Sequence, residues 1–175
     1  MSLVAPTAAS GQAPPTRPSP GAAASVPRYL AAIEHELGVL ELDPLCRAES
    51  PLHARCEVRV NAPGSSEELE LRIVYSDETD TVYAYAPGLA QAAPDAPSTP
   101  AVLRRLAELN WELLIGKLEW NAASGEIRLS MVLSTDSNFD RRAFRSMVRN
   151  LARLASQLGL ELRRIAAPAT RPQRP

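Results

Sequence analysis

A change of hydrophobic period within residues 101–133 constrains the fold of this chain more than any other feature. Apolar residues first recur at helical spacing, and they predict an amphipathic helix that begins near Pro100 and ends at Gly116: Val102, Leu106, Leu109 and Leu113. Apolar and polar residues then alternate over 117–120 and again over 126–133, which predicts two strands. The turn-forming residues 121–125 join these strands into a hairpin.

The same alternation predicts three more strands upstream, over residues 56–62, 68–75 and 82–86. Short segments rich in turn formers, 63–66 and 76–80, connect them as antiparallel hairpins. Residues 41–55 contain two prolines and no clear period, so we expect irregular chain there, and residues 87–99 are predicted to form a long loop.

Two further helices are predicted at the ends of the folded region. The first covers residues 27–40, with Ser25 as its N-cap, and the last covers residues 139–158, with Gly159 as its C-cap and a short extended piece after it. The order α-β-β-β-α-β-β-α indicates an α+β domain, in which helices pack on one face of a largely antiparallel five-stranded sheet. Residues 1–24 and 167–175 are Ala- and Pro-rich or basic tails that we expect to be disordered, which leaves one domain over 25–166.

Composition argues against several classes of function. The formal net charge is -1 and aromatic residues make up 5% of the chain, so neither charge nor stacking surface favours nucleic acid. No stretch approaches the roughly 20 apolar residues of a membrane span, and the N-terminus does not resemble a secretory signal peptide. A cytoplasmic protein is therefore expected.

No catalytic, cofactor-binding or metal-binding motif is evident. Glu108 and Glu112 share a helix face, which is also an ordinary pattern for a solvated surface. Cys46 or Cys56 could pair with His53, but the spacing of His53 and Cys56 points their side chains to opposite faces of an extended segment. We interpret the two cysteines as buried free thiols, with a disulfide between them as the alternative.

Two features are candidates for binding a partner. Arg142, Arg145, Arg149 and Arg153 lie on one side of the last predicted helix, and the chain from residue 139 onward holds nine arginines against two acidic residues. Such a face could hold an acidic partner or nucleic acid, or it could complement the acidic remainder of the same chain. Trp111 lies off the buried stripe of its helix, where core or edge packing is our preferred interpretation and an exposed interface anchor is the alternative.

One stretch of the chain resembles the YbjN-like family. The resemblance is carried by Leu109-Asn110-Trp111-Glu112, by Gly116-Lys117-Leu118, and by the turn and strand that follow over residues 121–133. That family groups proposed sensory transduction regulators, and its fold resembles type III secretion chaperones. The resemblance implies a small α+β domain that binds proteins, is often dimeric and has no catalytic residues to carry over.

The sequence therefore predicts a non-enzymatic protein-binding module, chaperone-like or regulatory, that forms a homodimer and needs no cofactor. Its predicted binding residues are Trp111 and the four arginines of the last helix. The alternative is a regulatory domain that binds a small ligand or nucleic acid through those arginines.

Overall fold

The structure, a computed structural model, describes residues 26–61, 68–136 and 138–167 of the 175 in the chain. The three helices are α1 (Leu30–Val39), α2 (Thr99–Glu112) and α3 (Arg141–Ala166). The six strands are β1 (Leu45–Ala48), β2 (His53–Asn61), β3 (Glu68–Ser76), β4 (Thr81–Gln91), β5 (Lys117–Trp120) and β6 (Glu126–Ser134). The predicted α+β class is confirmed. The predicted tails, the Ser25 cap and the 63–66 turn lie outside the described residues, apart from Ala167, which follows α3.

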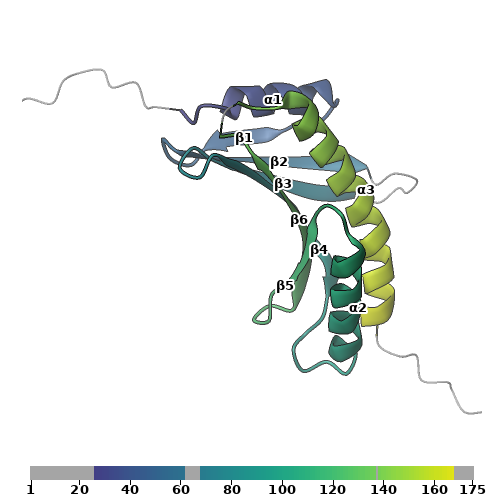
Figure 1. Cartoon of the computed structure of the whole chain (residues 1–175). Helices are drawn as coiled ribbons and strands as arrows, with labels where there is room; N and C mark the ends of the chain where they lie inside the picture. Colours follow the sequence, from purple (N-terminus) through teal and green to yellow (C-terminus); the bar gives the residue numbers. More distant parts are fainter. Residues whose placement is uncertain (1–25, 62–67, 137, 168–175) are drawn as a thin grey trace, which may run out of the picture.

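The strands form one sheet in the order β1-β2-β3-β4-β6-β5, and every neighbouring pair is antiparallel. The first four strands form a meander. The chain then passes through α2 to β5 at the far edge and returns as β6 between β5 and β4. Figure 1 shows the sheet strongly twisted, with α3 lying across it, α1 beside one end of α3 and α2 beside the other.

The core lies between the sheet and α3. The alternation read from the sequence is confirmed in β2 and β3, where every second side chain is buried, and in the first half of β6, which buries Ile127 and Leu129. The helix α3 buries one long apolar stripe against the sheet, mainly against β4 and β6: Phe144, Val148, Leu151, Ala155, Leu158 and Leu162. Each large apolar side chain buried in this way contributes about 2 kcal/mol to stability.

The prediction of five strands and irregular chain over 41–55 was wrong, because β1 adds a sixth strand at the sheet edge. Only four residues long and mostly exposed, β1 shows no alternation in its sequence. Cys46 of β1 lies directly opposite Cys56 of β2, and the two form a disulfide. The interpretation as free thiols was therefore also wrong.

The predicted 87–99 loop was too long, because β4 continues to Gln91. The register against β6 shifts between Ala86 and Ala90, so a bulge absorbs the Pro87-Gly88 pair while the strand goes on. Proline is tolerated here because β3 pairs with β4 only as far as Tyr85. The backbone N–H of Gly88 donates instead to the Glu126 carboxylate at 3.0 Å.

The ends of the helices also differ from prediction. The helix α3 does not stop at Gly159 but runs through it to Ala166. Gly159 is therefore a buried residue inside α3 and not a cap, and an added Cβ would lie at ordinary contact distance, 3.5 Å, from the Leu89 carbonyl oxygen. The first helix begins at Leu30 instead of residue 27, and α2 ends at Glu112, four residues before Gly116.

A buried carboxylate joins α1 to α3. Glu36 of α1 is only 1% exposed. Its two oxygens accept hydrogen bonds from Arg141, at 3.2 Å, and from Arg145. Because an unpaired buried charge is costly, this pairing fixes α1 against the first two turns of α3.

An aromatic cluster closes the same end of the core. The ring of Tyr29 contacts those of Tyr75 and Phe139, with centroids 5.6 and 5.5 Å away. Burial, together with its hydrogen bond to Asp77, raises the pKa of Tyr75 to about 12. The cluster joins the segment before α1 to β3 and to the segment before α3.

The Glu36 pairing predicts a specific pattern of stabilities. Arg145→Met should lower the free energy of unfolding by about 2 kcal/mol, because it leaves a buried carboxylate with one partner instead of two. Adding Glu36→Met should recover most of that loss, since apolar side chains then replace the ion pair. Urea unfolding measures both, with the exposed Arg153→Met as control. Equal losses for Arg145→Met and Arg153→Met would contradict the role given to Glu36.

The disulfide predicts that the domain is less stable under reducing conditions. Reduction should lower the free energy of unfolding by about 2–3 kcal/mol, as expected from the chain entropy of a short closed loop. Urea unfolding with and without reductant measures the change. The Cys46→Ala/Cys56→Ala variant should not respond to reductant, and a wild-type midpoint that is equally insensitive would rule out the bond in the folded protein.

Candidate functional site

Large apolar side chains are exposed where α2 leads into β5. Trp111 is 91% exposed and Leu114 is 99% exposed, while Ile115 and, from β6, Val132 are 50% and 65% exposed. We call these four residues the α2–β5 surface. The helix α2 buries the stripe that the sequence predicted, and Trp111 lies on its opposite side, so the preferred interpretation of Trp111 as a core or edge residue was wrong. The interface-anchor alternative remains.

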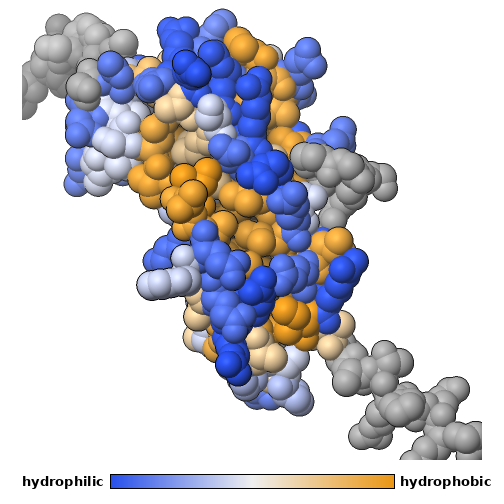
Figure 2. All heavy atoms as spheres, turned by 45° about the vertical axis from the view of Figure 1, so that its right-hand side comes forward, coloured by the Kyte–Doolittle hydropathy of each residue, from blue (hydrophilic) through white to orange (hydrophobic). Residues whose placement is uncertain are grey.

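A hollow of about 400 Å³ lies beside this surface. It is bounded by Ile115, Gly116, Met131 and Val132 on one side and by α3 on the other, through Ala143, Ser146, Met147 and Asn150. Figure 2, which brings α2 and α3 forward, shows hydrophobic atoms exposed between hydrophilic groups in the middle of this face. An apolar hollow next to exposed apolar side chains is typical of a surface that another molecule covers.

The edge of the sheet is open at the same place. The strand β5 pairs only with Ile127 to Ser130 of β6, so the rest of β6, residues 131–134, has no neighbour on that side in the described chain. Gly116 turns the chain away from β6 with a φ of 82°, and an added Cβ there would lie 3.2 Å from Met131. The open edge offers unpaired backbone groups next to the apolar side chains.

Asn110 holds this turn in place. Its side-chain amide donates to the Leu118 carbonyl oxygen at 3.0 Å, and its side-chain oxygen accepts the Leu118 N–H at 2.8 Å. These two bonds span the turn and fix the end of α2 against the start of β5. Asn110 and Leu118, which belong to the Leu-Asn-Trp-Glu and Gly-Lys-Leu segments noted in the sequence, thus bond to each other across the turn. Leu114 is exposed within this turn.

The four predicted arginines do not form one surface. Arg145 forms an ion pair with the buried Glu36 and thereby stabilises the fold. Arg142, Arg149 and Arg153 are exposed. Among the described residues, only Arg153 of these three has a side-chain partner: it donates a hydrogen bond to the Gln157 amide oxygen at 3.2 Å. Arg149 and Arg153 border a second hollow, on the side of α3 that faces α1. The basic face is thus smaller than the sequence suggested.

The residues considered for catalysis are held in structural contacts. Arg105 lies 3.2 Å from Glu108 and 3.9 Å from Glu112, and both acids are largely exposed. The His53 ring is within hydrogen-bond distance of the Ser50 and Ser76 hydroxyls. No group of three or more His, Cys, Asp or Glu in the described ranges could hold a metal ion.

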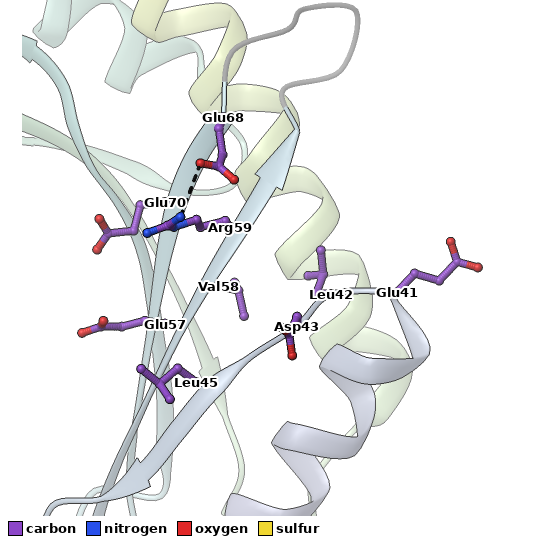
Figure 3. Close-up of a pocket in the computed structure, with 9 residues that line it drawn as sticks. All are labelled: Glu41, Leu42, Asp43, Leu45, Glu57, Val58, Arg59, Glu68 and Glu70. Atoms are coloured by element: carbon purple, nitrogen blue, oxygen red, sulfur yellow. Dashed lines mark ion pairs between the residues drawn. The ribbon is translucent and has the colours of Figure 1, made fainter.

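A third hollow, of about 560 Å³, lies just before the start of β1, where the edge of β2 beyond Glu57 becomes open. Its lining is mainly acidic, with one cation, Arg59, 3.9 Å from Glu68. Figure 3 shows that Glu57 and Glu70 point to one side of the sheet while Glu41 points to the other, so the carboxylates do not converge on one point. This arrangement places negative charge along the open edge of β2.

On the sheet face away from α3, Glu119 accepts hydrogen bonds from Tyr83 at 2.9 Å and from Arg128 at 2.8 Å. Burial disfavours ionisation of Glu119, but these two bonds outweigh it and hold the pKa of the carboxyl below its usual value. Arg128 also lies over the Tyr85 ring, 5.0 Å from its centroid. The group ties β5 to β4 and β6 and thereby supports the α2–β5 surface.

The chain belongs to the YbjN family. The family model, described as "putative bacterial sensory transduction regulator", matches residues 50–164, which are 115 of the 175. The match spans β2 to α3 and includes the whole α2–β5 surface, so the resemblance found in the sequence is confirmed. No curated protein matches the chain. No helix in the described part is long and apolar enough to cross a membrane.

The Glu119 contacts predict a pH-dependent stability. Because the folded-state pKa is lowered, their contribution is complete above the usual glutamate pKa of 4.5 and is lost as pH falls through the folded-state value. Glu119→Gln should therefore cost roughly 1 kcal/mol at pH 7 and much less near pH 3. Urea unfolding at both pH values measures this, with the exposed Glu34→Gln as control. A cost that is the same at both pH values would show that ionisation of Glu119 is not involved.

Proposed function

We propose that this YbjN-family protein is a non-enzymatic regulatory module that binds a protein partner through the α2–β5 surface. The observation that carries the proposal is the nearly complete exposure of Trp111 and Leu114 in a turn that Asn110 holds in one conformation. Exposed tryptophan is enriched among residues that dominate binding energy at interfaces. A pre-formed apolar surface also loses little conformational entropy when it binds.

The mode of binding that fits best is addition of an extended segment to the open edge of β6. Backbone groups of residues 131–134 would pair with the segment, and its side chains would alternate between the hollow beside α3 and the other face of the sheet. Apolar side chains at alternate positions suit Met131, Met147 and Ile115 in the lining. Arg142, exposed next to Ala143 of the lining, favours an acidic flanking residue in the partner.

A chaperone-like role, a homodimer and a cytoplasmic location remain predictions. A second copy could use the same open edge, since two β6 edges can pair about a two-fold axis. The disulfide bears on location, because such bonds persist mainly in oxidising compartments and are rare in the cytosol. Its presence in the native protein would therefore weigh against the cytoplasm.

Affinity purification of the tagged chain from its native lysate tests the proposal when three variants are compared. The wild type should retain a partner in near-stoichiometric amount, and the Trp111→Ala/Leu114→Ser/Ile115→Ser variant should lose at least 90% of it. The Leu52→Ser variant is the matched control, because Leu52 is also an exposed apolar residue but lies on the distant β1–β2 turn.

The surface variant must remain folded for this comparison to be decisive. Since the side chains of Trp111 and Leu114 make little contact with the core, we expect its free energy of unfolding to stay within about 1 kcal/mol of the wild type. A partner that the folded variant retains, or one lost equally by Leu52→Ser, would place binding elsewhere. Sedimentation equilibrium of the same proteins would show whether a second copy is what occupies the surface.

A further inference from the structure

We propose that the hollow between α1 and α3 is a binding site for an anionic amphiphile, a carboxylate attached to an aliphatic chain. This α1–α3 hollow has a volume of about 490 Å³ and lies on the opposite side of α3 from the hollow beside the α2–β5 surface. It is within the range of small-molecule sites, which are mostly apolar with a few well-placed polar groups. The proposal does not depend on a protein partner.

The walls of the hollow are aliphatic and come from three elements. They are Val39, Leu40 and Leu42 from the end of α1 and the turn after it, Val60 from β2, and Val148 and Ala152 from α3. Val39 is half exposed, although its neighbours in the wall are largely buried. The hollow exists because α1 stops at Val39, so the middle of α3 has no helix beside it on this flank.

Two cations stand at the rim of this apolar cavity. Arg149 and Arg153 are one turn apart on α3, so their side chains share a face of the helix. In the part of the chain that the structure describes, no acidic group pairs with either; Arg153 donates only to the Gln157 amide. A guanidinium binds a carboxylate through two parallel hydrogen bonds, which makes this anion a good match for the rim.

One acidic residue, Glu41, also borders the hollow. Its backbone has a φ of 60° in the turn that follows α1, and its side chain is exposed. Figure 3 shows this side chain pointing away from the other residues drawn there. Two arginines against one carboxylate leave a net positive rim, which selects an anion over a cation.

The lining also limits the class of ligand. None of the nine described residues that line the hollow is aromatic, so a nucleobase would find no stacking partner among them. An alkyl chain can instead bury its methylene groups against the apolar wall, and each buried methylene should increase the binding affinity about fourfold. A free carboxylate or phosphate without a chain would gain only the contact with the exposed arginines, which is weak in water.

Isothermal titration calorimetry of the full chain with butanoate, hexanoate, octanoate and decanoate, each below its micelle concentration, tests the proposal. Affinity should rise about fourfold per methylene until the wall is covered, and acetate and inorganic phosphate should show no binding. Decyltrimethylammonium, a cation with an alkyl chain one carbon longer, should bind at least tenfold more weakly than decanoate. No heat from decanoate at millimolar concentration, or equal binding of the cation, would overturn the proposal.

Variants then locate the site. Arg149→Gln/Arg153→Gln should weaken decanoate binding at least tenfold, whereas Arg142→Gln, which removes an exposed arginine outside the hollow, should leave it within twofold. Glu41→Gln should tighten it. Equal losses in the two arginine variants would mean unspecific attraction to a basic helix and would overturn the proposal. A dimer that Val39→Asp dissociates would show that a second copy fills the hollow, and would overturn it as well.

Discussion

The packing of α3 across the twisted sheet is the interaction on which the other features depend. This helix has 26 residues, and its apolar stripe, from Phe144 to Leu162, packs mainly against β4 and β6. Glu36 joins α1 to the beginning of this helix, and Arg105 of α2 joins its far end through Glu161 at 2.5 Å. The two shorter helices are therefore positioned by α3, one on each flank and at opposite ends.

This arrangement explains why the two apolar hollows lie where they do. The helix α1 has 10 residues and α2 has 14, so neither reaches the middle of α3. On one flank the uncovered part of α3 borders the α2–β5 surface, and on the other it borders Val39 and Val60. The two hollows are thus a consequence of helix lengths, because a longer α1 or α2 would bury the same residues as ordinary core.

Much of the fold could be predicted because its signals are local and periodic. The alternation in β2, β3 and β6 and the stripe of α3 each reflect burial of one face, which a sequence shows directly. The missed features depend on contacts between distant segments. The strand β1 exists through pairing with β2, and the burial of Glu36 requires two arginines more than 100 residues away.

The candidate site was predictable only in part for the same reason. Trp111 was correctly singled out as lying off the helical stripe, but the sequence did not decide between edge packing and exposure, because that depends on where α3 lies. The role of Asn110 is invisible without the turn that brings Leu118 eight residues later beside it. The sequence spacing places the four arginines of α3 on one helix face, but Arg145 pairs with the buried Glu36. Of the other three, Arg149 and Arg153 border the α1–α3 hollow, and Arg142 lies outside it.

The two edges of the sheet differ in a way that bears on function. Exposed edges promote unwanted pairing, and proteins commonly protect them with charges or short covering strands. At the β2 edge both devices are present. The short strand β1, joined to β2 by the Cys46–Cys56 disulfide, covers part of the edge, and acidic side chains line the remainder. At the β6 edge beyond β5, neither device is found among the described residues, and apolar side chains are exposed instead. A chain that protects one edge and leaves the other open and apolar is expected to use the open edge for binding.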